Sequence, residues 1–552
     1  MRRWIRLGAV AVSVALVAAA CTKETDGTNG TEGGMVEGGI YRLGSPSTID
    51  SLNPFVAFEQ DAYNMFMQIY PFLVYYDENL EFTGDFADGW ELAPDNTSIT
   101  FATRSGGAWS DGDPLTADDV AYTLNLIVRF PGPTGLMAGY AKHITGAEAT
   151  DENTVVVSYE QPINEGWALS QLLQIPILPE HVWSQHEGDD GKDLKRFTNA
   201  DPTVSGGAFV LDNYEKRDIA QFSANPGFYG PEPHIDGYGL KFYTNTDAMI
   251  SALQNGEIDA VETLPATAYD AVKANPDLVV LEGEGLNEDD FIINSNKPLH
   301  EELLDPAVRD AFAHAINYQE MVDTVLDGHG SPATTFVPPG SGEWHNANLE
   351  PIAYDIDEAN RILDDAGYEM GPDGVRIANG HPMEYEVLTP NDVVGADREF
   401  QIIQGGFEQI GVKLSQKSLD PDALFVAIAG PTWVDYDGFD LAIWNWYMLQ
   451  DPDFALSVLT CEQFGFWNDT GYCNEEYDAL YEEQGVTVDQ AARQEIVYRM
   501  QEIVYEDKPY IMLQYRDMLE AHSAEWEGFV FTPLGSYNNL TKLTLLNVHQ
   551  VG

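Results

Sequence analysis

The chain has 552 residues, 44% of them hydrophobic, which is typical of a globular protein but longer than one core usually holds, so two or three domains are expected. Its formal net charge is −63 at pH 7. A surface of this charge repels nucleic acid and anionic lipid, which argues against a nucleic-acid-binding protein and against electrostatic attachment to a membrane. The acidic residues are spread along the whole chain, which favours a solvated surface suited to high salt over an acidic ligand site.

Residues 1–20 are predicted to be a secretion signal. A basic tip is followed by a short run of small apolar residues, 7–20, which cannot span a bilayer. Cys21 comes next, and the polar residues after it (TKETDGTNGTEGG) make 21–36 a flexible leash. The arrangement resembles a bacterial lipoprotein, with cleavage before Cys21, acylation of its thiol and anchoring to the outer face of the cell membrane, although Ala18 stands where lipoproteins usually have Leu. The alternative is ordinary secretion with Cys21 incidental.

Beyond the leash, apolar runs consistent with strands alternate with helical patterns, which predicts an α/β architecture. Thr116, with Asp119 three residues on, predicts a helix N-cap. Strands are expected over residues 240–244, 291–295, 384–388, 412–419, 439–446 and 510–515. Helices are expected over residues 116–128, 247–255, 306–326, 356–365 and 489–505. The turn-rich breaks between these elements are short, so we expect the domains to be in close contact.

Two cysteines remain besides Cys21. Cys461 and Cys473 form an even pair in an exported chain, which indicates a disulfide that closes a small loop. The sequence has no CxxC, HExxH or GxSxG pattern, and its 11 His lack ligand spacing. We therefore predict no metal, no cofactor and no catalytic residue.

Several motifs in consistent order resemble the oligopeptide- and dipeptide-binding family (family 5) of the extracellular solute-binding proteins of ABC transporters. The longest is 84–126 (GDFADGWELAPDNTSITFATRSGGAWSDGDPLTADDVAYTLNL). The others are SLNPF (51–55), SGGAFVL (205–211), NPGFYG (225–230), PAVRDAFAHAI (306–316), YDIDEANRILDDAGY (354–368), DPD (451–453) and 472–480. Together they cover most of the chain after the leash.

The resemblance implies a two-lobed fold of the periplasmic-binding-protein type (type II, cluster C), with an extra domain inserted in the N-terminal lobe. Carried onto this chain, lobe one comprises 37–75, 200–286 and 508–552, and the inserted domain comprises 76–199. Lobe two comprises 287–507. Hinges are expected near 287–291 and 506–509, and a solute is enclosed when the lobes close.

The segment 433–454 (WVDYDGFDLAIWNWYMLQDPDF) is the strongest candidate for ligand contact, because a strand there ends in aromatic residues just before an Asp-Pro turn. Trp433, at the start of the segment, belongs to the predicted site. Strand neighbours alternate faces, so Trp444 and Trp446 point to one side and Asn445 and Tyr447 to the other. Such a surface suits a largely desolvated pocket for an amphipathic solute. The alternative, that a tryptophan is core, applies most to Trp444.

The sequence offers several candidates for the residue that pairs with a charged group of the ligand. Peptide-binding relatives place an aspartate three residues after the first tryptophan of this strand, where it pairs with the α-ammonium of the ligand, but this chain has Tyr447 there. Burying an ammonium without a counter-charge is costly. Either Asp451 or Glu59 therefore replaces that aspartate, or the ligand is an oligosaccharide, whose rings would stack on the aromatic side chains.

The first lobe is expected to supply the remaining contacts. By resemblance, Phe58 and Glu59 lie beside the ligand, and Gly206 and Gly207 let the lobe approach it closely. The sequence thus predicts a monomeric, lipid-anchored receptor that delivers an oligopeptide or oligosaccharide to an ABC permease and its ATPase. An extracellular ligand sensor of the same fold is the alternative. A secreted hydrolase that uses paired carboxylates is a remote one.

Overall fold

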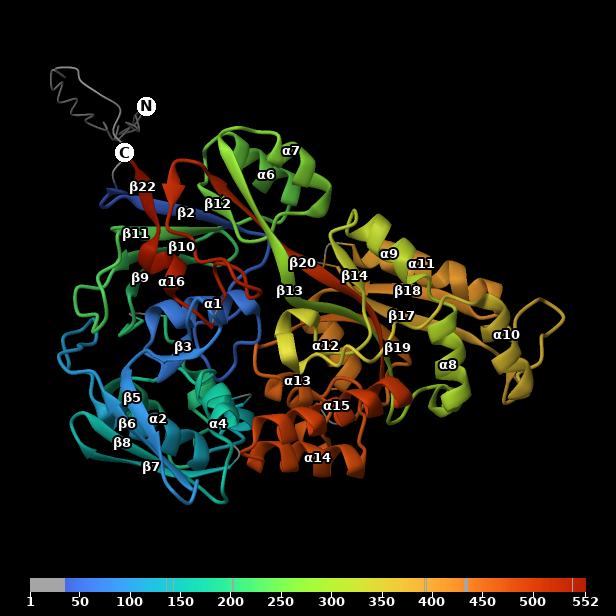
Figure 1. Cartoon of the computed structure of the whole chain (residues 1–552), viewed down its shortest axis with the longest axis horizontal. Coiled ribbons are helices and arrows are strands. Elements are labelled where there is room, and N and C mark those ends of the chain that lie inside the picture. The colour runs from blue at the N-terminus through green and yellow to red at the C-terminus, as the bar shows by residue number, and fades with distance from the viewer. Residues whose placement is uncertain are drawn as a thin grey trace, which may run out of the picture.

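The computed structural model describes residues 35–135, 137–141, 143–200, 203–391, 393, 395–430, 435–538 and 540–552. The predicted signal, Cys21, most of the leash and Trp433 lie outside these residues. The chain folds into two α/β lobes, with a third domain beside the first lobe (Figure 1). This confirms the predicted fold class. No helix in the described part of the chain is long and apolar enough to cross a membrane.

The first lobe is built on one half of a large mixed sheet. Strand β2 (Ile40–Ser45) runs parallel to β11 (Gly237–Phe242) on one side and to β12 (Ala260–Val261) on the other. The remaining elements are β1 (Met35–Val36), α1 (Gln60–Ile69), β3 (Val74–Tyr76), β4 (Phe82–Gly84), β9 (Phe209–Glu215), β10 (Ile219–Ala224), α6 (Thr246–Gln254), α7 (Tyr269–Lys273), β21 (Trp526–Glu527), α16 (Leu543–Asn547) and β22 (His549–Val551).

The inserted domain is a four-stranded antiparallel sheet, in the order β5-β6-β8-β7, with helix α2 against it. As predicted, Thr116 caps α2, and Asp119 completes a capping box. The elements are β5 (Ala87–Leu92), β6 (Ser98–Thr103), α2 (Ala117–Arg129), α3 (Met137–Tyr140), β7 (Ile144–Asp151), β8 (Thr154–Tyr159), α4 (Glu165–Leu172) and α5 (Glu180–Trp183).

The second lobe completes the large sheet, in the order β18-β17-β19, and covers it with helices. The helix predicted over 306–326 is two helices, because Asn317 caps a new one by accepting the N–H of Glu320. The elements are α8 (Pro306–His314), α9 (Tyr318–Val325), β14 (Gly330–Pro332), α10 (Ile356–Asp365), β15 (Ile377–Ala378), β16 (His381–Pro382), β17 (Glu384–Pro390), α11 (Ala396–Gln409), β18 (Lys413–Leu419), α12 (Pro421–Ala429), β19 (Leu441–Tyr447), α13 (Asp453–Val458), α14 (Glu475–Val486) and α15 (Gln490–Asp507).

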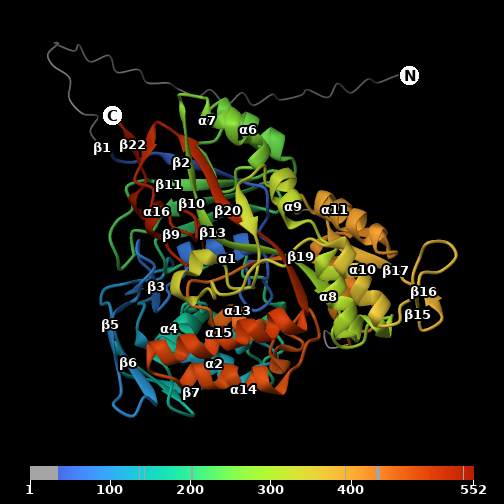
Figure 2. The same cartoon turned by 45° about the vertical axis from the view of Figure 1, so that its right-hand side comes forward.

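Two long antiparallel strands, β13 (Leu278–Ile293) and β20 (Tyr510–Ser523), connect the lobes. They stay side by side in the turned view (Figure 2). Ile511 and Leu513 are buried in the core of the second lobe, whereas Leu519 belongs to a core cluster of the first. The crossover in β20 therefore lies between 513 and 519. This corrects the boundary expected at 507/508, since the first residues of β20 still belong to the second lobe.

The inserted domain also contacts the second lobe directly. Asn164 donates its backbone N–H to the carbonyl of Gly485 at 2.6 Å and its side-chain amide to the carbonyl of Thr487 at 2.8 Å. Trp167 is buried there, so close to Gly485 that a Cβ at that glycine would lie 3.2 Å from the indole. These contacts join α4 to the end of α14.

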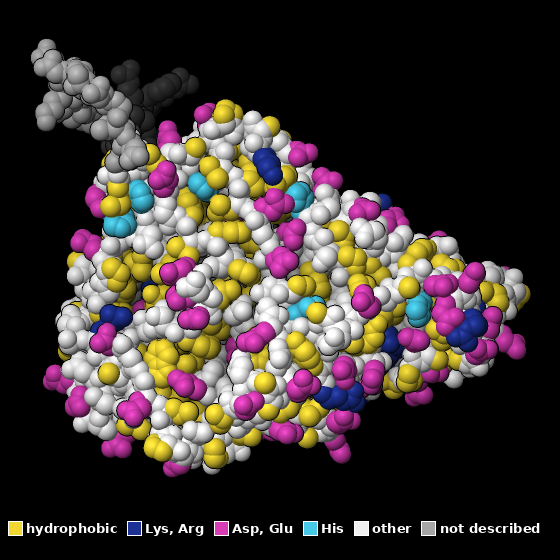
Figure 3. Space-filling model, in the orientation of Figure 1, with side chains coloured by type: hydrophobic (Ala, Val, Ile, Leu, Met, Phe, Trp, Pro, Cys, Tyr) yellow, Lys and Arg dark blue, Asp and Glu magenta, His cyan; other side chains and the backbone are white. Residues whose placement is uncertain are grey.

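Acidic side chains are scattered over the surface rather than gathered in one patch on the face that Figure 3 shows, and basic side chains are few. This agrees with the even spread of Asp and Glu along the sequence. The interior holds the exceptions, because several carboxyl groups are fully buried in the crossover strands.

Candidate functional site

A cavity of about 400 Å³ lies where the two lobes, the crossover strands and the inserted domain meet. The first lobe supplies the start of α1 and the residues after β12, and the second lobe supplies the end of β19. Tyr140 and Gln174 reach it from the inserted domain. A cavity formed by four parts of the fold can change shape when the lobes move relative to one another.

Six of the predicted site residues line this cavity: Phe58, Glu59, Trp444, Asn445, Trp446 and Tyr447. The last four end strand β19, and side chains from both of its faces reach the cavity. All four are half-buried, so Trp444 is a wall residue and not a core residue. The strand and its aromatic run could be found in the sequence because both are local patterns.

The aromatic wall is a packed group. The ring of Trp446 lies 5.9 Å from that of Phe454 and 6.2 Å from that of Trp467, in edge-to-face arrangements. Tyr140 of the inserted domain lies 6.3 Å from Phe454. Such contacts fix the rings and stabilise the wall by about 0.5–1.5 kcal/mol per pair beyond their area burial.

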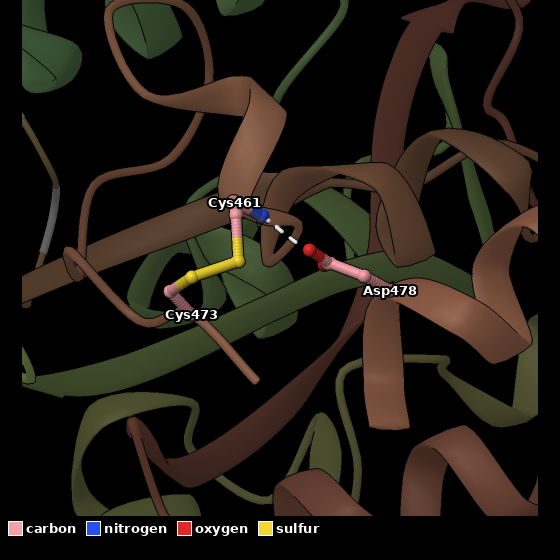
Figure 4. A group of neighbouring side chains, drawn as sticks. All are labelled: Cys461, Cys473 and Asp478. Carbon is pink, nitrogen blue, oxygen red and sulfur yellow. Dashed lines mark hydrogen bonds between the residues drawn. A yellow bond between two sulfur atoms is a disulfide. The ribbon is translucent and has the colours of Figure 1, made fainter. Parts of the chain in front are cut away.

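Trp467 is held in place by a disulfide. The structure joins Cys461 and Cys473 (Figure 4). The loop that this bond closes contains Trp467. The backbone N–H of Cys461 donates to the carboxylate of Asp478 at 3.1 Å, which attaches the loop to the first turn of α14. The disulfide predicted from the sequence therefore closes the loop that supplies Trp467 to the aromatic wall.

Asp451 does not line the cavity, which corrects one predicted contact. Its two carboxylate oxygens accept hydrogen bonds from Arg493 at 2.7 and 2.8 Å, and both side chains are almost fully buried. Arg493 also donates to Gln484 at 2.8 Å and lies over the ring of Trp344. This ion pair lines a second cavity, of about 420 Å³, to which β3 and β4, the start of α4 and the second lobe all contribute.

Gly206 and Gly207 do not lie beside the cavity, which corrects the prediction that they let the first lobe approach the ligand. Both donate their backbone N–H to the carbonyl of Ile69, at 2.8 and 2.9 Å, at the end of α1. A Cβ at Gly207 would lie 2.3 Å from the carbonyl oxygen of Gln68, and one at Gly206 would lie 2.7 Å from Trp109. Gly207 is needed for close packing inside the first lobe and Gly206 for close packing against the inserted domain, and neither lines the cavity.

Sequence reasoning missed three carboxyl groups that line the cavity: Asp61, Glu262 and Glu520. Asp61 stands in the first turn of α1, Glu262 follows β12 directly, and Glu520 lies on β20. No local motif links them, because they come together only in the folded chain. Burial raises the pKa of Glu520 to about 7. Burial and then the charge of Asp61 raise the pKa of Glu262 well above its ordinary value.

Arg516 is the only Lys or Arg among the described residues that line the cavity. Its guanidinium donates to Asp289 at 2.7 Å and to Glu399 at 3.0 Å. Gln514 also donates to these two carboxyl groups, at 2.8 and 2.9 Å. The positive charge of Arg516 is therefore compensated by the protein itself.

A second set of carboxyl groups lies behind the tryptophans. On β13, Glu288 is the cross-strand partner of Trp446, and Asp290 that of Trp444. Both carboxyl groups are fully buried, and none of their oxygens accepts a hydrogen bond from a neighbouring backbone or side-chain donor. Burial, and then neighbouring negative charges, raise the pKa of each well above its ordinary value. Each of these groups therefore keeps its proton to a higher pH than an exposed acid does.

Two groups of potential metal ligands occur in the described residues: Cys461, Cys473 and Asp478, and Glu282, His329 and Asp517. In the first group the sulfur atoms are bonded to each other. In the second, Glu282 already accepts hydrogen bonds from Tyr269 and from His329. We assign a metal to neither.

Comparisons with known proteins agree with this architecture. The family model described as "Bacterial extracellular solute-binding proteins, family 5 Middle" matches residues 81–465, more than half of the chain. Protein XP55 of Streptomyces lividans is 26% identical over 532 residues, 95% of this chain and 92% of that protein. The probable D,D-dipeptide-binding periplasmic protein DdpA of Escherichia coli is 24% identical, over 90% of this chain and 91% of that protein.

Among solved structures, the oligopeptide-binding protein AppA of Bacillus subtilis, in complex with a nonapeptide, superposes with a TM-score of 0.83. It is 20% identical, and the match covers 94% of this chain and 100% of that one. At this identity the likeness shows the fold alone.

Proposed function

Because the chain belongs to family 5 of the bacterial extracellular solute-binding proteins, we propose that it captures a peptide between its lobes and delivers it to an ABC importer. Members of this family bind a solute and catalyse no reaction. The observation that carries the proposal is the cavity at the junction of the lobes, with aromatic walls from the second lobe and polar groups from the first. This combination holds an amphipathic chain by its apolar parts and orients it by its polar ones. The likeness to DdpA and AppA supports a peptide.

The direct test is to identify what the protein retains. Mass spectrometry of the purified protein under native conditions should find peptides bound in equimolar amount. The melting temperature should rise when a defined peptide pool is added, because a ligand that binds only the folded state stabilises that state. A protein that is stabilised by oligosaccharides and not by peptides would overturn the peptide assignment and leave the family assignment intact.

Trp446→Ala should weaken binding of the retained peptide about thirtyfold, because truncation of an aromatic anchor in the ligand cavity removes about 2 kcal/mol of binding free energy. The melting temperature without ligand should fall less than in a core variant, since Trp446 is half-buried and loses its ring contacts to Phe454 and Trp467. Isothermal titration and thermal melts measure the two effects. Trp526→Ala is the matched control: Trp526 is fully buried in the first lobe and outside the cavity, so this variant should lose stability and keep its affinity.

We further propose that acylated Cys21 anchors the protein to the outer face of the cell membrane. A domain with this negative charge is repelled by anionic lipid, so the acyl chains would be its sole attachment. Cys21→Ala should give a folded protein that leaves the membrane fraction. If the variant still sediments with membranes after a high-salt wash, the lipid anchor is wrong.

A further inference from the structure

The charges that line the cavity between the lobes are unbalanced. Four carboxyl groups line it, those of Glu59, Asp61, Glu262 and Glu520, and its one cation among the described residues, Arg516, is paired with Asp289 and Glu399. This was not expected from the even spread of acidic residues in the sequence. The imbalance lies in a partly enclosed space, where charges interact more strongly than in water.

Three of these carboxyl groups lie together on the first-lobe side. Asp61 accepts a hydrogen bond from the hydroxyl of Ser45 at 2.7 Å, and its carboxyl group interacts electrostatically with that of Glu262. Glu520 contributes a third group within electrostatic range of Glu262.

Glu520 offers an unused acceptor. One of its oxygens accepts the backbone N–H of Ser536 at 2.7 Å, while the other is buried and accepts no hydrogen bond from the protein. The side chain is only 2% exposed, yet it lines the cavity. A buried acceptor without a donor is costly, and a donor supplied by a ligand would remove that cost.

The aromatic wall faces the same carboxyl groups. Burial, and then the charges of Glu262, Glu520 and Asp61, raise the pKa of Tyr447 to about 12, so its hydroxyl lies within the field of all three. Carboxyl groups on one side and aromatic rings on the other suit a cation attached to an apolar body, because a bound cation favours the ionised form of the carboxyl groups.

We propose that the cavity binds its ligand through a positively charged group, an ammonium or guanidinium, held by Asp61, Glu262 and Glu520. The assignment rests on the proposed function and names the charge of the solute that the protein captures. The cation enters a site where the three carboxyl groups supply acceptors and compensating charge, and the net negative charge of the chain steers it there.

The cation has two sources in a peptide, the free amino terminus and a Lys or Arg side chain, and four pools of random pentapeptides separate them. Two pools have free amino termini and two are N-acetylated, and in each pair one pool lacks Lys and Arg. The protein is freed of bound ligand and mixed with each pool, and retained peptides are measured by mass spectrometry. The acetylated pool without Lys and Arg should be retained about tenfold less than the best pool. The retention of the two intermediate pools identifies the source of the charge.

Asp61→Asn, Glu262→Gln and Glu520→Gln should each lower retention of the cationic peptides about tenfold. Glu257→Gln is the matched control, because it makes the same charge change on an exposed side chain outside the cavity and should have no effect. Near-ultraviolet circular dichroism confirms that each variant is folded, and the pool comparison needs no variant. Equal retention of all four pools would show that the cavity does not recognise a positively charged group, and the proposal of peptide capture would remain. Retention from no pool would overturn both.

Discussion

Arg493→Met should lower the free energy of unfolding by about 3–5 kcal/mol, because it leaves the carboxylate of Asp451 buried without its cation. Arg493 is 1% exposed and donates two hydrogen bonds to Asp451, and both are lost in this variant. The hydrogen bond to Gln484 is lost as well. Chemical denaturation at constant pH measures the change.

The double variant Arg493→Met with Asp451→Asn should recover most of this loss, because no charge is then left unpaired and the asparagine can still accept the backbone N–H of Asp453. Asp451→Asn alone should bind peptide as tightly as the unmodified protein, since Asp451 lies outside the ligand cavity. A large loss of affinity in that variant without a loss of stability would return Asp451 to the ligand site.

The contrast between Asp451 and Trp446 shows what the sequence could predict. The aromatic run at the end of β19 is a local pattern, and the end of that strand forms the wall of the cavity. The role of Asp451 depends on a residue 42 positions away in the sequence, on helix α15. A motif that matches a family turn gives no sign of such a partner.

The same distinction applies to the secondary structure. The helix expected over 356–365 is α10, which has a strong amphipathic pattern and Asp355 as its N-cap. The strand expected over 291–295 is only the end of β13, a strand of 16 residues. Its earlier part contains the exposed Glu282 and Glu284 and the buried run Glu288 to Asp290, and these acidic residues hide the apolar pattern by which strands are recognised.

The carboxyl groups of the cavity could not be recognised in the sequence either. Asp61, Glu262 and Glu520 stand on three separate segments of the first lobe and β20. In a chain with 90 acidic residues, no single one is distinctive by its type. Only the crossover of β20 and the parallel pairing of β2 with β12 bring the three segments to one end of the sheet.

The protein should become less stable as the pH rises from 5 to 8, by several kcal/mol in its free energy of unfolding. Burial raises the pKa of Asp469 and of Glu520 to about 7 and that of Glu399 to about 8. The pKa values of Glu288 and Asp290 are also raised, well above the ordinary value of a carboxyl group. In the unfolded chain these groups titrate near pH 4. The folded state therefore holds protons that the unfolded state has released.

This difference in bound protons makes the free energy of unfolding fall as the pH rises. The stabilisation is complete below the unfolded pKa and is lost as the pH rises through the folded pKa, at about 1.4 kcal/mol for each extra proton and pH unit. Denaturant titrations at pH 5, 6, 7 and 8 should be made in 1 M salt, where a Debye length of about 3 Å screens surface repulsion but leaves the buried groups unaffected.

Glu288→Gln isolates the buried contribution, because an amide of the same shape is neutral at every pH. It should reduce the slope by up to one proton and make the protein more stable than the unmodified one at pH 8. The exposed control Glu257→Gln should leave the slope unchanged. If stability in 1 M salt were flat from pH 5 to 8, the carboxyl groups behind the tryptophans would be ionised in the folded protein, and a compensating cation would have to accompany them.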